Sequence, residues 1–350
     1  MTQRSDSRTR MPTAPLGRGG PIVSRFALGT MTFGVETDEA GAFRQLDMFV
    51  DHGGTFIDTA DVYAGGMSEE IIGRWGKQRG GMGDLVLATK GRFGPPAGST
   101  GASRRALTRC VDASLRRLQV DAIDLYFVHG WDKDVDVAET LATLRDLVAA
   151  GKIHHIAWSN LAGWQLERIV TTARMGGYPP PVCVQPHYNM LERGAELELI
   201  PCALEAGIGL TPWSPLGGGW LTGKYNSSTR PSGATRLGED PNRGVEAYDL
   251  RNTDRTYAVL DVLRGIAERH GRPLSHVALA WLMSRPGVAA ILLGARTTEQ
   301  LEENLDAADL VLEPSEIAAL TEVSARGVPA YPYQFLQDWA GMDVWKRLGS

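Results

Sequence analysis

Short apolar runs recur along this chain at nearly regular intervals, and amphipathic segments separate them. Eight of these runs are expected to be strands, near residues 26–29, 55–59, 85–90, 123–129, 153–158, 182–186, 208–213 and 289–293. Seven of them begin roughly thirty residues apart, which is the spacing of β/α units in a parallel sheet. The pattern therefore predicts an α/β fold, a single closed (β/α)8 TIM barrel.

Glycine follows several of the amphipathic segments. The helices expected over residues 38–52, 141–150 and 199–206 each stop at a glycine before the next strand. Glycine adopts the left-handed conformation that ends a helix without steric cost. These positions support the alternation of helix and strand.

Four segments lie outside the repeating units. Residues 1–14 are expected to be a disordered extension, so that the barrel covers residues 15–350, and the turn-rich residues 15–24 predict a hairpin that closes the bottom of the barrel. Residues 226–251, after the seventh strand, form either a mobile loop over the active face or a disordered surface segment. The aromatic C-terminal tail, residues 331–345, either packs on the core or borders a substrate pocket, and we favour the pocket.

The composition argues against several classes of protein. The formal net charge of −5 does not fit a nucleic-acid-binding protein, whose surface is basic. No apolar run reaches the length of about eighteen residues that a membrane span requires. The N-terminus lacks the hydrophobic core of a secretory signal. The three cysteines form no CxxC motif, which favours a reducing, cytoplasmic location, and nothing indicates an oligomeric state.

Four polar residues stand at or just beyond the ends of the second, third and fourth strands: Asp58, Tyr63, Lys90 and His129. The C-terminal ends of barrel strands converge on one face, where catalytic side chains gather. There, Lys90 would lower the pKa of Tyr63, and Asp58 would hold Lys90 in place. Tyr63 could then protonate a carbonyl oxygen that His129 orients. Each residue alone has a structural explanation, but their joint appearance predicts a catalytic site.

Further motifs follow in order along the chain. They are Leu28–Gly34 (LGTMTFG), Trp158–Asn160 (WSN), Val184–Asn189 (VQPHYN), Trp213–Leu216 (WSPL) and Gly294–Asn304 (GARTTEQLEEN). With the four polar residues, they make the sequence resemble the aldo-keto reductases from about residue 15 to residue 320. The resemblance implies a (β/α)8 barrel, NADPH as the cofactor and reversible reduction of a ketone or aldehyde.

The resemblance also implies the binding residues. The expected cofactor contacts are Gly29, Thr30, Met31, Ser159, Asn160, Gln185, Tyr188, Trp213, Ser214, Pro215, Leu216, Gly217, Gly294, Arg296, Thr297, Gln300, Glu303 and Asn304. The expected substrate pocket contains Phe33, Trp131 and Tyr188. Among them, Tyr188 would stack on the nicotinamide ring, although a buried, purely structural tyrosine is the alternative.

Two groups of these residues have a clear physical role under the resemblance. The side chains of Ser159, Asn160 and Gln185 suit the nicotinamide carboxamide. Arg296 and Thr297 precede a helix, where free N–H groups and a guanidinium would meet the 2′-phosphate. The sequence therefore predicts a preference for NADPH over NADH.

Several alternatives stay open within this family. The segments Lys90–Phe93, Ser103–Arg105 and His129–Asp132 resemble a bacterial branch that acts on bulky or secondary-metabolite carbonyls. An enoyl reductase of a deoxysugar pathway is one alternative. A non-catalytic interaction subunit is another, because the potassium-channel β subunits resemble the same family. The pair Ala157-Trp158 departs from the small residue and valine that are common there, which leaves the local packing open.

Other known sites are not supported. No G-x-G-x-x-G motif lies between a strand and a helix, so a Rossmann domain is not expected. Residues 218–224 approach a P-loop, but Tyr225 replaces the required serine or threonine. His154 and His155 are adjacent on a strand and point to opposite faces, so no metal site is expected.

Overall fold

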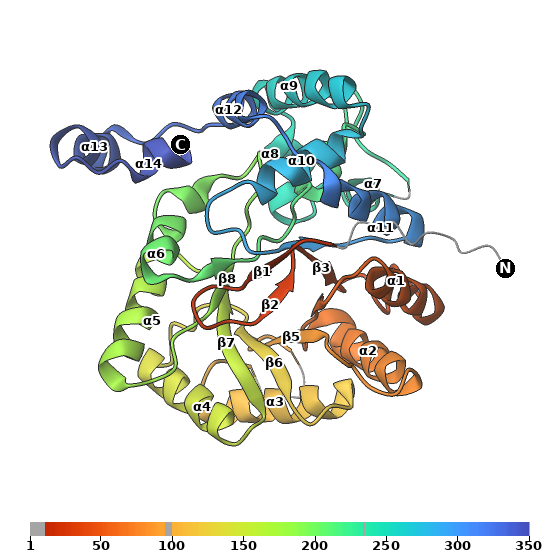
Figure 1. Ribbon diagram of the computed structural model, residues 1–350, viewed down its shortest axis with the longest axis vertical. Coiled ribbons are helices and arrows are strands. Elements are labelled where there is room, and N and C mark those ends of the chain that lie inside the picture. The colour runs from red at the N-terminus through yellow and green to blue at the C-terminus, as the bar shows by residue number, and fades with distance from the viewer. Residues whose placement is uncertain (1–10, 95–99, 234, 350) are drawn as a thin grey trace.

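The computed structural model describes residues 11–94, 100–233 and 235–349. Eight parallel strands form one sheet in the order β10-β3-β4-β5-β6-β7-β8-β9 (Figure 1). They are β3 (Phe26–Gly29), β4 (Phe56–Asp58), β5 (Val86–Gly91), β6 (Ile123–Val128), β7 (Ile153–Ser159), β8 (Cys183–Gln185), β9 (Gly209–Leu210) and β10 (Ile291–Leu293). Leu210 exchanges backbone hydrogen bonds with Gly287 and Ala289, just before β10, so the two ends of the sheet meet. The predicted barrel is confirmed.

Helices cover the outer face of this sheet (Figure 1). The longer ones are α1 (Glu39–Asp51), α2 (Met67–Gln78), α3 (Arg104–Leu118), α4 (Val137–Ala149), α5 (Gly163–Gly176), α6 (Leu199–Ala206), α9 (Asp254–His270), α10 (Leu274–Met283), α11 (Thr298–Leu305) and α12 (Pro314–Val323). Asp38 caps α1 by accepting a hydrogen bond from the N–H of Gly41. Gly207, with φ of 71°, ends α6 in the left-handed conformation, as expected from the sequence.

A small antiparallel hairpin precedes the barrel. It consists of β1 (Thr13–Pro15) and β2 (Ile22–Ser24). Leu16 and Val23 are fully buried and belong to the inner cluster that fills the barrel. The predicted disordered extension is therefore wrong for residues 11–14, because pairing with β2 orders them, whereas residues 1–10 lie outside the described part of the chain.

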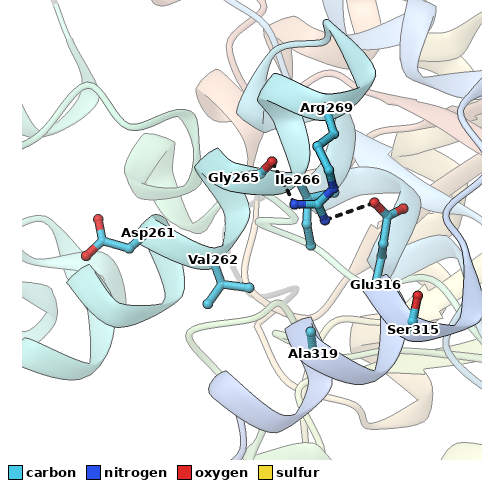
Figure 2. Close-up of a pocket in the computed structure, with 8 residues that line it drawn as sticks. All are labelled: Asp261, Val262, Gly265, Ile266, Arg269, Ser315, Glu316 and Ala319. Carbon is cyan, nitrogen blue, oxygen red and sulfur yellow. Dashed lines mark hydrogen bonds and ion pairs between the residues drawn. The ribbon is translucent and has the colours of Figure 1, made fainter.

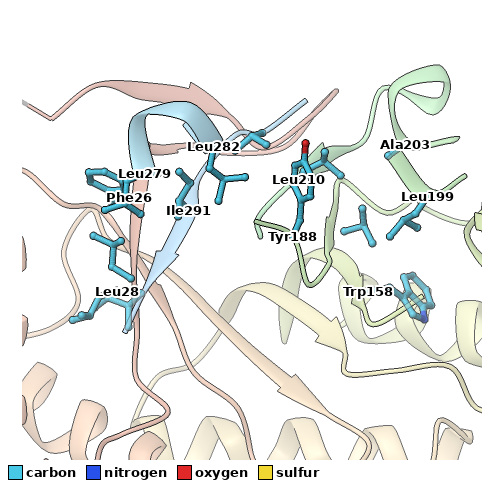
Figure 3. Close-up of a cluster of buried hydrophobic side chains, with 14 of the residues drawn as sticks. Phe26, Leu28, Trp158, Tyr188, Leu199, Ala203, Leu210, Leu279, Leu282 and Ile291 are labelled. Carbon is cyan, nitrogen blue, oxygen red and sulfur yellow. The ribbon is translucent and has the colours of Figure 1, made fainter. Parts of the chain in front are cut away.

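The apolar core has two layers, one inside the sheet and one between the sheet and the helices. Figure 3 shows Phe26, Leu28 and Ile291 of neighbouring strands beside side chains of α10. Ala157 belongs to the inner cluster and Trp158 to the outer one. Successive strand residues face opposite sides, so the unusual Ala-Trp pair is accommodated by placing the small residue inside the barrel.

The long segment after β9 is folded where the structure describes it. It contains α7 (Arg236–Glu239), a 3₁₀ turn (Gly244–Glu246) and α8 (Tyr248–Arg251). Leu237 and Tyr248 are buried. Disorder of the whole segment, one of the two predictions from sequence, is therefore wrong. Its mobility stays a prediction.

The C-terminal tail packs on the outside of the barrel beside α12 (Figure 1). Its helices are α13 (Phe335–Trp339) and α14 (Val344–Leu348). Arg193 and Arg285, both buried, donate hydrogen bonds to the carbonyl oxygen of Leu348. The indole of Trp345 donates to the carbonyl oxygen of Leu197. The favoured prediction that the tail borders the substrate pocket is thus wrong, because buried guanidinium groups hold its end elsewhere.

Candidate active site

Lys90 is the centre of the predicted catalytic group. Its fully buried ammonium donates to Asp58 Oδ1 at 2.5 Å, to the carbonyl oxygen of Thr59 at 2.8 Å and to the hydroxyl oxygen of Tyr63 at 3.2 Å. These three bonds use all three donors of a lysine ammonium. Residues from β4, β5 and the turn after β4 are thereby fixed relative to one another.

The charge states of this group follow from burial and pairing. Burial opposes the charge of Lys90, but Asp58 and Tyr63 together raise the pKa of Lys90 above its usual value. Burial also raises the pKa of Tyr63, although the Lys90 charge acts in the opposite direction. The net rise differs from the lowered pKa expected from sequence, because the cost of burying a tyrosinate exceeds the attraction of an ammonium that Asp58 already pairs. At rest the group holds an ammonium and a protonated phenol.

The second oxygen of Asp58 is also occupied. Gln185 Nε2 donates to Asp58 Oδ2 at 2.9 Å. Thr30 donates its hydroxyl to the backbone carbonyl of Asp58 at 3.1 Å and accepts a hydrogen bond from Ser68. Asp58 is therefore held on both its side chain and its backbone, so that it positions Lys90 rigidly.

His129 lies beside Tyr63, with ring centroids 6.1 Å apart. Burial, with smaller contributions from the charges of Lys90 and Arg92, lowers the pKa of His129 to about 3. The imidazole is consequently neutral near pH 7, and a neutral imidazole has one N–H donor. It can donate a hydrogen bond to a carbonyl oxygen without adding a charge.

Backbone strain is concentrated around these side chains. Five non-glycine residues in the described part of the chain have positive φ, and four of them lie in the segments that follow strands on this face: Ala64, Arg92, Asn160 and Ser214. Only asparagine among these four types adopts the left-handed region readily. Such strain persists where surrounding contacts impose it, which is common at functional sites.

One of these strained residues, Asn160, joins neighbouring strand ends. Asn160 donates its side-chain amide to the carbonyl oxygen of His129 at 3.0 Å and accepts a hydrogen bond from the indole of Trp213 at 3.2 Å. Ser159 donates its hydroxyl to the carbonyl oxygen of Gln185 at 2.8 Å. The predicted residues of β7, β8 and the loop after β9 thus form one polar surface next to His129.

Arg296 lies at the start of α11, as predicted. Thr297 caps that helix by accepting a hydrogen bond from the N–H of Gln300, and Gln300 accepts one from the N–H of Arg296. The guanidinium of Arg296 binds Glu239 through two bonds of 2.8 Å and Glu36 through one of 3.0 Å. The predicted phosphate-binding cation therefore already has carboxylate partners.

A cleft between α9 and α12 lies on the outside of the barrel (Figure 2). Arg269 crosses it and donates to Glu316 at 3.1 Å and to the carbonyl oxygen of Gly265 at 3.1 Å. None of the four predicted catalytic residues lines this cleft. The catalytic assignment therefore stays at the strand ends.

Comparison with known proteins agrees with this architecture. A model of the aldo/keto reductase family matches residues 25–325. An uncharacterized oxidoreductase of Bacillus subtilis is 36% identical over 323 residues, covering 88% of this chain and 94% of the relative. The chain belongs to the aldo/keto reductase family.

Two further relatives show the range of this family. An aryl-alcohol dehydrogenase [NADP(+)] of Phanerodontia chrysosporium is 31% identical, covering 93% of this chain and 88% of its own. A probable voltage-gated potassium channel subunit beta of Arabidopsis thaliana is 34% identical, covering 85% and 90%. The family membership and the oxidoreductase relatives support an oxidoreductase that acts on carbonyl groups. None of the described helices is both long and apolar enough to cross a membrane.

Two predicted binding residues of this aldo/keto reductase are not at its surface. Tyr188 is fully buried, and its hydroxyl donates to Glu196 at 2.5 Å and accepts from Arg285 at 3.0 Å. Phe33 is also fully buried. The predictions that Tyr188 stacks on the nicotinamide and that both residues line the substrate pocket are wrong, because their rings belong to the core.

The other predicted residues vary in exposure. Residues with solvent-accessible side chains or backbone are Met31, Asn160, Trp213, Ser214, Leu216, Gly294, Arg296, Thr297, Gln300 and Glu303. Buried ones are Thr30, Ser159, Gln185, Pro215, Gly217 and Asn304, and Gly29 is half-buried at the end of β3. The exposed set follows the strand ends from β3 to β10.

The sequence interpretation missed Arg236. This half-buried residue of α7 has no hydrogen-bond partner for its Nε within the described part of the chain. Its charge acts on Tyr63, and its Cδ lies 3.9 Å from the position that a Cβ on Gly218 would occupy. Its place in a polar loop gave no signal that it reaches the active face.

Two aromatic residues on the same face were missed as well. The ring of Phe93 lies 5.3 Å from that of His129 and is 46% exposed. Trp164, at the start of α5, is 55% exposed and lies 5.4 Å from Trp131. Gly130 allows the approach of Phe93, because a Cβ there would come within 3.1 Å of the ring. The sequence signal that could have found them is that both are aromatic residues within a few positions of the end of a strand.

Proposed function

We propose that this protein is an NADPH-dependent aldo-keto reductase that reduces a ketone or aldehyde and oxidises the corresponding alcohol in reverse, with Tyr63 as the proton donor. The observation that carries the proposal is the hydrogen bonding of Lys90, whose fully buried ammonium links the half-buried Tyr63 to the buried Asp58 beside His129. A lysine on the surface, or a tyrosine without a charged neighbour, would be explained by solvation or packing alone and would not indicate catalysis. A buried ammonium that donates to a phenol oxygen stabilises the tyrosinate that proton donation leaves behind.

Each of the four side chains has a separate role in the proposed reaction. Tyr63 donates its proton to the carbonyl oxygen, and Lys90 stabilises the resulting tyrosinate. Asp58 holds Lys90 in the charged form. The neutral His129 donates a hydrogen bond to the same carbonyl oxygen and so fixes its orientation. The nicotinamide cofactor, when bound, supplies the hydride that adds to the carbonyl carbon.

The residues present fit such a cofactor. The side chains of Ser159, Asn160 and Gln185 would bind the carboxamide. The nicotinamide ring would stack on Trp213 and not on the buried Tyr188, because Trp213 is only half-buried. The unpartnered Nε of Arg236 supports an anion nearby, since a guanidinium donor without an acceptor is costly to bury.

A preference for NADPH over NADH rests on Arg296. It precedes α11, whose first N–H groups and positive dipole end favour an anion. The 2′-phosphate of NADPH would meet Arg296 and Thr297 there. The NADP(+)-dependent aryl-alcohol dehydrogenase among the relatives supports the same preference.

A screen of simple aldehydes and ketones for NADPH oxidation tests the proposal. We expect turnover of at least one simple carbonyl, and a loss of about 10²- to 10⁴-fold in Tyr63→Phe with little change in NADPH affinity. The matched control is Tyr331→Phe, because Tyr331 is 78% exposed on the tail. Near wild-type turnover in Tyr63→Phe would contradict the assignment of Tyr63. NADPH binding without any turnover would instead favour an interaction subunit.

The small-molecule substrate is the only partner that the proposal requires. We also propose a cytoplasmic location. The three cysteines, Cys110, Cys183 and Cys202, form no CxxC motif and no paired framework in the sequence, which supports a reducing compartment.

A further inference from the structure

The carboxylate that binds Arg296 comes from a distant part of the chain. Glu239 ends α7, inside the long segment after β9, and lies 57 residues before Arg296 in sequence. Its two oxygens each accept a 2.8 Å hydrogen bond from a different nitrogen of the Arg296 guanidinium. This two-bond arrangement is the one that a guanidinium also forms with a phosphate.

Glu36 adds a second negative charge to the same place. It accepts hydrogen bonds from Arg296 at 3.0 Å and from Arg243 at 2.9 Å, and its side chain is 14% exposed. The terminal nitrogens of Arg296 therefore have carboxylate acceptors already. A dianionic phosphate that approaches Arg296 meets two carboxylates of like charge.

The two carboxylates differ in how easily they can move away. Glu239 is 48% exposed, and Arg296 is its only ion-pair partner among the described residues. Glu36 is less exposed and keeps Arg243 as a partner. Glu239 can therefore turn into solvent when a phosphate takes its place, whereas Glu36 stays.

We propose that Glu239 is an internal competitor of the cofactor's 2′-phosphate for the guanidinium of Arg296. The inference rests on the proposed function, in which Arg296 binds that phosphate. NADPH displaces Glu239 and so releases the α7 end of the segment from Arg296. NADH has no 2′-phosphate and leaves the Glu239–Arg296 pair intact. Glu239 consequently reduces the affinity for NADPH but not for NADH, and determines how large the preference between the two cofactors is.

The substitution Glu239→Gln tests this competition. It keeps the size of the side chain and removes its charge, and the exposure of Glu239 means that the fold tolerates the change. The dissociation constants of NADPH and NADH are measured by fluorescence titration, without any substrate. Exposed ion pairs have modest strength, so we expect NADPH to bind about two- to fivefold more tightly to Glu239→Gln, with NADH unchanged.

Two controls make the result specific. Glu39 forms a similar two-bond pair with Arg74, at 2.8 and 3.1 Å, on the outside of the barrel, so Glu39→Gln should change neither affinity. The fragments 2′,5′-ADP and 5′-AMP differ only in the 2′-phosphate. Glu239→Gln should improve the binding of 2′,5′-ADP and leave that of 5′-AMP unchanged.

Arg296→Ala separates the failure of this inference from failure of the proposed cofactor site. If Arg296→Ala leaves NADPH affinity unchanged, the 2′-phosphate does not bind at Arg296. Both the proposed phosphate site and the competition by Glu239 are then refuted. If Arg296→Ala weakens NADPH binding but Glu239→Gln changes nothing, only the competition is refuted. An equal gain for NADPH and NADH in Glu239→Gln would also overturn it, because the effect would then not depend on the 2′-phosphate.

Discussion

Replacement of Lys90 by methionine is the strongest single test of the buried catalytic group. The side chains of Lys90 and Asp58 are 0% and 1% exposed. Methionine has a similar length but no charge, so Lys90→Met leaves the Asp58 carboxylate buried with Gln185 as its remaining side-chain partner. Stability and catalysis should therefore fall together.

The expected loss of stability follows from this burial. Removing one partner of a buried ion pair costs about 3–5 kcal/mol, because the other charge is left without compensation. A typical domain is stable by about 5–15 kcal/mol, so this loss is a large fraction of the total. The double variant Lys90→Met with Asp58→Asn contains neither charge. It should be more stable than the sum of the two single changes predicts, by about 2 kcal/mol or more.

Urea unfolding, followed by tryptophan fluorescence, measures these differences for the wild type, both single variants and the double variant. Turnover is measured in parallel and should fall by orders of magnitude in Lys90→Met, since Tyr63 loses the charge that stabilises its anion. A Lys90→Met variant within about 1 kcal/mol of the wild type would refute the reasoning, since no charge would then be left unpaired. Simple additivity of the two single changes would refute it as well.

Three further predictions concern other parts of the active face. Burial and the nearby Glu69 raise the pKa of Asp61 to about 7 from its ordinary value of 3.8. The unfolded chain thus loses this proton near pH 4 and the folded chain near pH 7, so the contribution of Asp61 to stability falls as the pH rises between these values. Asp61→Asn should raise the melting temperature at pH 8 and change it little at pH 4, and an equal shift at both would contradict the assignment. Truncation of Phe93 to leucine or of Trp164 to alanine should lower kcat/KM for aromatic aldehydes more than for saturated ones of the same size, by about two- to tenfold for each ring contact, and an equal loss for both substrates would argue against stacking. Trypsin should cleave within residues 226–251 more slowly when NADPH is bound, whereas equal rates with and without NADPH would mean that the segment is not a lid.

Features that depend on local pattern could be predicted from the sequence. The eight strands were found because apolar runs and glycine-terminated helices repeat along the chain. Asp58 and Lys90 were placed together because the ends of neighbouring parallel strands converge. Each of these inferences needs only residues that are close in sequence and the geometry of a barrel.

Features that depend on distant partners could not be predicted in this way. Tyr188 is drawn into the core by Glu196 and by Arg285, which lies 97 residues away. Arg296 acquires Glu239 as a partner through the folding of the long segment. The raised pKa of Tyr63 depends on the degree of burial, which no motif specifies.

The attachment of the C-terminal tail bears on how such a chain can vary in evolution or be trimmed in the laboratory. Arg193 donates to the carbonyl oxygens of Leu348 and Gly349, and Arg285 to that of Leu348. A truncation that removes the last few residues would leave these two nearly inaccessible cations with fewer acceptors. Residues 331–339, by contrast, expose much of their aromatic surface. Insertions and substitutions should therefore accumulate in the tip of the tail, while its final turn should tolerate change as poorly as the interior of the barrel.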